Sequence, residues 1–171
     1  LLALHNYALC LKQQKLFERA LAQFDLAIAV NPQYELAYKN KFALLASLGR
    51  HIECIAGLQQ ALRCVPHSTE LNLLLAASLR ADKQDVQALA VVEHLLDVNS
   101  KLAAAHNTRG NILLDLGRAQ DAVGAYTQAI QLQTDYANAE GNLAIAYLSL
   151  AEYDKALAGF DRALQLDPRL P

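Results

Sequence analysis

The chain repeats itself at a fixed period of 34 residues along its whole length. Columns of equivalent positions, two of mostly small residues and one of large apolar residues, show the period. They are Ala20, Cys54, Ala88, Ala122 and Ala156; Ala27, Ala61, Leu95, Ala129 and Ala163; and Phe24, Leu58, Val92, Tyr126 and Phe160. Such a period is typical of a solenoid, in which each unit buries its apolar face only against its neighbours. We therefore expect a single array over 1–171, with units at 1–34, 35–68, 69–102, 103–136 and 137–170.

Each unit contains two segments with helical periodicity, joined by short polar turns. In the fourth unit, Gly117 follows the first segment, and in three units Pro32, Pro66 or Pro168 follows the second. Glycine and proline at these places end helices, and connections this short make the two helices antiparallel. The pattern predicts an all-α fold with first helices near 1–14, 35–48, 69–82, 103–116 and 137–150, and second helices near 18–31, 52–65, 86–98, 120–132 and 154–167.

The small and aromatic columns have a packing interpretation. Small residues allow two helix backbones to approach closely, and the large apolar residue of each unit fills the space left between helices. If Phe160 is buried, we expect the Phe160→Ala substitution to lower the free energy of unfolding by about 3–5 kcal/mol.

Composition and charge argue against several classes of protein. The net charge of −2 gives no general attraction to nucleic acid, and the longest apolar run, residues 71–79, is far too short to cross a membrane. Three cysteines without metal-ligand spacing favour a reducing compartment, and hence a cytoplasmic location. The chain has no Met and begins inside a helical pattern, so we expect it to be a piece of a longer protein.

No residue pattern indicates an enzyme, a metal site or a cofactor site. The five histidines form no HExxH motif or close pair, and no glycine-rich phosphate loop is present. The acidic pairs Asp82/Asp85 and Glu152/Asp154 fall at turns, where negative charge stabilises the start of the following helix. We expect no catalytic residue, no cofactor and no metal.

The repeated columns resemble the tetratricopeptide repeat over the whole chain. The residues that carry the resemblance are Ala8, Leu11, Ala20, Phe24, Ala27 and Pro32; Gly110, Leu113, Ala122, Tyr126 and Ala129; and Ala144, Tyr147, Ala156, Phe160, Ala163 and Pro168. The resemblance implies helix–turn–helix units stacked into a right-handed α-solenoid, with the first helices lining a concave groove. This chain departs from the pattern at Phe42, where a small residue is expected, and at Lys83, which replaces the turn glycine.

The groove implied by the resemblance is the candidate binding site. Asparagine side chains can donate to and accept from a peptide backbone, and the inward positions of the first helices carry several of them together with separated charges. The residues that we expect to contact a peptide or partner segment are Asn6, Lys39, Asn40, Arg80, Asn107, Asn111, Asp115 and Asn142. The alternative for each asparagine is a hydrogen bond within the array.

Of two binding patterns that occur within the family, this chain lacks one and partly matches the other. The Lys–Asn–Asn–Lys–Arg clamp for acidic peptide tails fits no register of this chain. An asparagine column, Asn6, Asn40, Leu74, Thr108 and Asn142, matches at three of five positions the arrays in front of O-linked N-acetylglucosamine transferases. The resemblance thus implies a non-enzymatic protein-interaction scaffold. The alternatives are a substrate-recognition or oligomerisation arm of a larger enzyme such as a glycosyltransferase, and a homo-oligomer formed through uncovered terminal repeats around Leu157 and Leu164.

Overall fold

The computed structural model describes residues 1–169 and contains ten helices and no strand within that range. The chain divides into two compact units, Leu1–Lys83 and Gln84–Pro171. The boundary lies within the third repeat, between its first and second helices. The all-α fold predicted from the sequence is confirmed.

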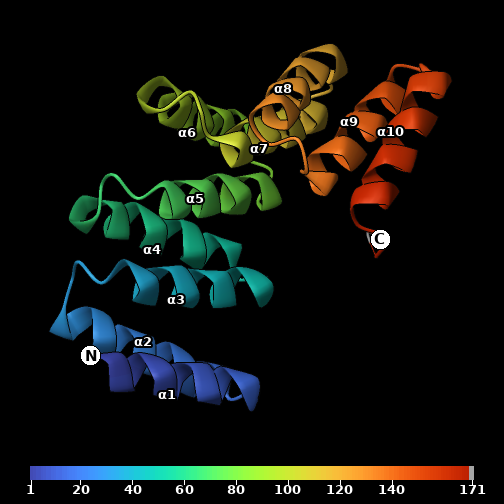
Figure 1. The fold of residues 1–171 in the computed structure, drawn as a ribbon. Coiled ribbons are helices and arrows are strands. Elements are labelled where there is room, and N and C mark those ends of the chain that lie inside the picture. Colours follow the sequence, from blue (N-terminus) through green and yellow to red (C-terminus); the bar gives the residue numbers. More distant parts are fainter. Residues whose placement is uncertain (170–171) are drawn as a thin grey trace. The chain divides into compact units, whose positions relative to one another are not determined.

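The first unit contains five helices that pack in chain order (Figure 1). Each helix contacts the next one along the chain, and the third also contacts the fifth. Their bounds are α1 Leu2–Gln13, α2 Phe17–Val30, α3 Glu35–Ser47, α4 His51–Cys64 and α5 Thr69–Ala81.

The second unit also contains five helices, and consecutive helices of this unit from α6 to α10 contact one another. The first helices of its two complete repeats, α7 and α9, are also in contact. The bounds are α6 Asp85–Val98, α7 Ala103–Asp115, α8 Ala119–Leu132, α9 Ala137–Ser149 and α10 Tyr153–Leu166. All ten helices lie within one residue of the predicted bounds, because the repeated breakers act locally.

The core follows the repeated columns, with one informative exception. Phe24, Leu58, Val92 and Tyr126 are each 0% exposed. Phe160, the fifth member of this column, is only half-buried because no further helix of the described chain packs against that side of α10. The predicted loss of about 3–5 kcal/mol for Phe160→Ala assumed a buried ring. Because the ring is only half-buried, we expect a smaller loss in the free energy of unfolding.

Two glycines explain how large side chains fit between helices. A Cβ built on Gly110 would lie 2.5 Å from Cε1 of Tyr126, so the glycine makes room for that ring. In the second repeat the roles are exchanged: Phe42 occupies the small-residue column, and a Cβ on Gly57 would lie 2.8 Å from Cζ of Phe42. The departure noted at Phe42 is thus compensated by a glycine on the partner helix.

The turn between the two helices of each repeat has one conformation, whatever residue occupies it. Its central residue has a left-handed φ of 60° at Lys15, 72° at Gly49, 62° at Lys83, 72° at Gly117 and 59° at Ala151. After Lys15, Gly49, Gly117 and Ala151, the following residue donates its N–H to a carbonyl five residues earlier, as Arg118 does to Leu113 at 2.8 Å. The backbone therefore keeps the glycine geometry at Lys83, where the sequence departs from the pattern.

We expect the Lys15→Gly substitution to raise the free energy of unfolding by about 0.5–1 kcal/mol, because it relieves the steric cost of left-handed φ for a residue with a Cβ. Urea unfolding followed by circular dichroism measures the change. Gly117→Ala is the matched control: nothing lies within 4 Å of the added Cβ, so only backbone strain changes and stability should fall. If both substitutions raise, or both lower, the free energy of unfolding, strain from the left-handed φ is not the explanation.

Candidate functional site

The first helices of each unit carry the polar residues predicted to bind a partner. We call the surface formed by α1, α3 and α5, and separately the surface formed by α7 and α9, the first-helix face of each unit. The first unit contributes Asn6, Lys39, Asn40 and Arg80, and the second contributes Asn107, Asn111, Asp115 and Asn142.

In the first unit, Asn40 links α3 to α1. Its amide nitrogen lies 3.4 Å from Nε2 of His5 and donates to the carbonyl of Leu36 at 3.0 Å. His5 is 3% exposed and lies between the rings of Phe24 and Tyr34, with centroid distances of 5.6 Å and 5.5 Å. Burial lowers the pKa of His5 below its usual value, which favours the neutral ring inside this aromatic contact.

The charged residues of this face are also engaged. Nζ of Lys39 lies 2.5 Å from a carboxylate oxygen of Glu70, and both side chains are about half exposed. An exposed ion pair of this kind contributes at most about 1 kcal/mol, so a ligand carboxylate can displace Glu70 at low cost. Asn6 is exposed, and Arg80 is half-buried and interacts within the chain.

In the second unit, three asparagines form side-chain hydrogen bonds. Asn142 on α9 donates its amide to the carbonyl oxygen of Asn107 on α7 at 3.0 Å. Asn107 is 9% exposed. It also forms a hydrogen bond with Tyr136. Burial raises the pKa of Tyr136, and this hydrogen bond partly offsets the rise. On the same face, Asn111 accepts a hydrogen bond from the hydroxyl of Tyr126 at 2.7 Å.

The structure therefore divides the predicted contacts into two kinds. Asn107 is bonded to Asn142 of the next repeat, and Asn111 is bonded to Tyr126 of its own repeat. Asn6 is exposed, and Asn142 is half-buried. An asparagine amide has two N–H donors and a carbonyl oxygen, so one bond to Asn107 leaves Asn142 with further capacity. Asp115 is exposed and also interacts within the chain.

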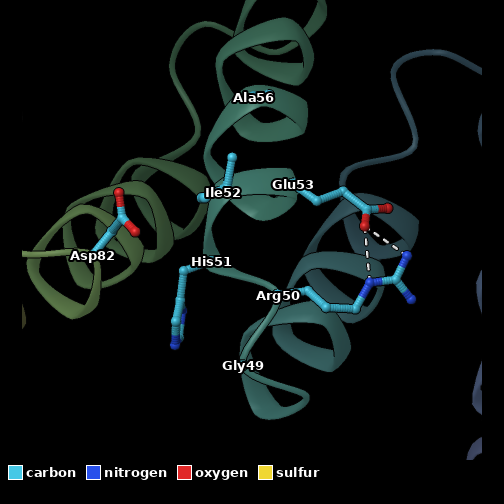
Figure 2. Close-up of a pocket in the computed structure, with 7 residues that line it drawn as sticks. All are labelled: Gly49, Arg50, His51, Ile52, Glu53, Ala56 and Asp82. Carbon is cyan, nitrogen blue, oxygen red and sulfur yellow. Dashed lines mark hydrogen bonds and ion pairs between the residues drawn. The ribbon is translucent and has the colours of Figure 1, made fainter.

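A hollow of about 460 Å³ lies beside the N-terminus of α4 (Figure 2). Arg50 at its edge donates to Glu53 at 2.8 Å and to Glu18 at 2.7 Å, so two carboxylates already compensate its charge. In Figure 2 His51 points away from Asp82. The hollow therefore offers neither a paired acid and base nor an uncompensated cation for an anionic ligand.

A second hollow, of about 510 Å³, is lined by residues of α9 and α10. Its apolar residues are Ile145, Phe160, Ala163 and Leu164, and Asn138 and Asn142 supply amides. Ile145 is 46% exposed and Leu164 is 49% exposed. The sequence predicted uncovered apolar surface around Leu157 and Leu164, and both side chains are exposed.

Within residues 1–169, no group of three or more His, Cys, Asp or Glu residues is placed to hold a metal ion. None of the described helices combines the length and apolar character that crossing a membrane requires.

Three family models, each described as a tetratricopeptide repeat, match residues 1–34, 103–136 and 137–170. Together these matches cover more than half of the chain. The chain belongs to the tetratricopeptide repeat family. Repeats of this family are typically non-catalytic interaction modules, and the helical hairpins described above are their structural units.

The chain is also similar to several longer curated proteins. It is 29% identical over 181 aligned residues to the human protein O-mannosyl-transferase TMTC3, an alignment that covers 96% of this chain and 20% of that protein. It is 26% identical to the probable UDP-N-acetylglucosamine–peptide N-acetylglucosaminyltransferase SPINDLY of Hordeum vulgare, over 94% of this chain and 14% of that protein. The chain thus spans a fifth or less of the length of these two relatives.

Two solved structures confirm the fold. The tetratricopeptide repeat protein TTC0263 of Thermus thermophilus matches with a TM-score of 0.80 and 24% identity, over 98% of this chain and 91% of that one. YrrB, described as a TPR protein with an unusual peptide-binding site, matches with a TM-score of 0.68 and 23% identity, over 97% and 86% of the two chains. At these identities the likeness shows the fold alone.

Proposed function

We propose that this chain is a non-enzymatic protein-interaction scaffold that binds a peptide segment on its first-helix faces. The observation that carries the proposal is the half-buried amide of Asn142, held in place by its hydrogen bond to Asn107. Because the bond fixes the amide before a ligand arrives, little side-chain entropy is lost on binding. A fixed amide can pair with a peptide backbone through both its donor and its acceptor.

The exposed groups around these amides determine what kind of segment fits. In the first unit, the Lys39–Glu70 pair offers one cation and one anion on the first-helix face, which also carries the exposed Asn6. In the second, the apolar Ile145 lies one turn beyond Asn142 on α9 and is 46% exposed. This mixture favours an extended or helical segment held by backbone contacts and a few apolar side chains.

Substitution of the accessible amides tests the proposal. Peptides selected from a random displayed library against the whole chain serve as probes. We expect the pair of changes Asn6→Ala and Asn142→Ala to weaken their binding about tenfold, as loss of one or two hydrogen bonds would do. Asn107 and Asn111 are left intact because they hold neighbouring side chains in place.

The matched control removes two exposed amides from second helices, through Gln60→Ala and Gln120→Ala. This variant should bind the selected peptides as the unmodified chain does. If the asparagine pair has no effect, or if the glutamine pair weakens binding equally, the first-helix faces are not the binding site.

A second candidate function is a recognition or oligomerisation arm of a larger transferase. It is favoured by the two relatives described as transferases, in which the matched part is a fifth or less of the protein. A longer reading frame that encodes a sugar-nucleotide-binding α/β domain beside this array would support that candidate over an independent scaffold.

A further inference from the structure

His5 is a buried titratable residue at the place where α1 meets its neighbours in the first unit. Its side chain is 3% exposed. The ring is enclosed by Phe24 of α2, by Tyr34 of the segment before α3, and by Asn40 of α3. A change in the charge of this ring therefore acts on the contacts that hold α1 against α2 and α3.

The orientation of the Asn40 amide determines which nitrogen of His5 carries the proton. Nδ2 of Asn40 donates to the carbonyl of Leu36 at 3.0 Å and lies 3.4 Å from Nε2 of His5. Turning the amide over would place its oxygen against the Leu36 carbonyl oxygen, so the NH₂ group must face the ring. Nε2 is then the acceptor, and neutral His5 carries its proton on Nδ1.

The site does not accommodate the protonated form of the ring. An imidazolium has a proton on both nitrogens and needs two acceptors. Here Nε2 faces a donor, and Nδ1 is buried without a hydrogen-bond partner among residues 1–169. Protonation would replace the bond from Asn40 by two opposed donors and would bury a positive charge without an acceptor.

The charged side chains of the surrounding helices do not supply the missing acceptor. They are Lys12 on α1, Glu18, Arg19 and Asp25 on α2, and Glu35, Lys39 and Lys41 on α3. The three carboxylates already pair with other side chains, respectively Arg50, Lys41 and Ser68. The titratable group in contact with the ring is Tyr34, through an edge-to-face contact. Burial is the cause that lowers the pKa of His5.

The packing between α1 and α3 makes this hydrogen bond important. In other repeats the first helices pack on one another, α3 on α5 and α7 on α9, whereas α1 and α3 pack less closely. The bond from Asn40 to His5 joins α1 to α3 directly. Few other contacts between these two helices can compensate for its loss.

We infer that His5 is a pH-sensitive contact within the first unit: the neutral ring holds α1 against α2 and α3, and protonation of the ring releases α1. The released state is a local opening, in which the other helices of the unit stay folded. The inference concerns the packing of helices and does not rest on peptide binding at the first-helix faces.

The direction of the pH dependence follows from the lowered pKa. His5 in the closed chain has a pKa below its usual value of 6.5, so the open state binds more protons once the pH falls below that value. Closure of α1 is therefore complete above this pH and is lost as the pH falls through the lowered pKa. Uptake of one proton raises the equilibrium constant for opening by at most about tenfold per pH unit.

NMR titration of the unmodified chain tests the protonation state directly. Long-range ¹H–¹⁵N spectra of the imidazole rings distinguish the two neutral tautomers, and the signal absent from His5→Gln identifies His5. We expect His5 to carry its proton on Nδ1 and to titrate below 6.5. This measurement needs no folded variant, since a signal can also be assigned from the contacts of the ring with Phe24 and Tyr34.

Backbone hydrogen exchange, corrected for the intrinsic effect of pH, tests the opening. Below about pH 6.5, amides of α1 should lose protection by up to about tenfold per pH unit, while amides of α4 keep theirs. His5→Gln should remove this dependence, because the glutamine oxygen can accept from Asn40 but does not titrate. His94→Gln is the matched control: His94 is exposed on α6, so this variant should behave as the unmodified chain does.

Three results would overturn the inference. One is a His5 ring that titrates at or above 6.5, or that carries its proton on Nε2 when neutral. Another is protection of α1 that does not change with pH, or that changes equally in His5→Gln. The third is equal loss of protection in α1 and α4, which would show that the unit opens as a whole.

Discussion

Tyr126→Ala is expected to lower the free energy of unfolding of the second unit by about 3–5 kcal/mol. Tyr126 is 0% exposed and packs in a cluster with Leu113, Ala122 and Ala125. Its ring fills the space that Gly110 leaves open. The substitution leaves a cavity there and removes the hydrogen bond that the hydroxyl gives to Asn111 at 2.7 Å. Urea unfolding followed by circular dichroism measures the loss.

Two variants separate the contributions to this loss. Tyr126→Phe removes only the hydroxyl and should cost about 0.5–1.5 kcal/mol, the value of one hydrogen bond. Phe160→Ala alters the equivalent position of the last repeat, where the ring is half-buried, and should cost less than Tyr126→Ala. If the two alanine variants lose the same stability, burial by the following repeat does not set the cost.

The second large effect is expected at Gly57. Phe42 is 2% exposed, and its ring is nearly parallel to that of Tyr38, at a centroid distance of 6.2 Å. A Cβ on Gly57 would overlap the Phe42 ring, so Gly57→Ala should cost about 1–3 kcal/mol although alanine favours a helix. Gly124 also lies in a helix but has nothing within 4 Å of an added Cβ, so Gly124→Ala should stabilise the protein by about 1 kcal/mol.

A double-mutant cycle tests whether the two residues compensate one another. In a Phe42→Ala background, Gly57→Ala should be neutral or stabilising, because the ring that it would meet is gone. The coupling free energy between the two positions should then exceed about 1 kcal/mol. Equal costs of Gly57→Ala in both backgrounds would show that the glycine has another role.

Much of the fold could be predicted from the sequence because its signals are local. Glycine or its substitute at residues 15, 49, 83, 117 and 151 marks a turn in every repeat, and even Lys83 and Ala151 adopt the left-handed conformation there. Between these turns, the helical spacing of the apolar residues places them on one side of each helix. The repeated columns then identify Phe24, Leu58, Val92 and Tyr126 as core residues, and all four are buried.

The candidate site was less predictable because equivalent positions do not have equivalent neighbours. Nothing in the spacing of Asn107 and Asn142 shows that one donates to the other at 3.0 Å. The Lys39–Glu70 pair joins two helices through residues that belong to different columns. The bond from Tyr126 to Asn111 exists in one repeat alone of the five, since only the fourth has both side chains at these positions.

The sequence by itself determined the helical hairpins of this protein, their bounds and their shared core columns, because turn residues and helical periodicity act within a few residues of the chain. Only the tertiary structure decided which asparagines are used inside the array and which of the equivalent side chains lie in solvent. Phe160 is the same residue type as Phe24 of its column, yet Phe160 is half-buried whereas Phe24 is 0% exposed. Burial of a repeat's face depends on whether another helix packs against it, which no residue within the repeat encodes.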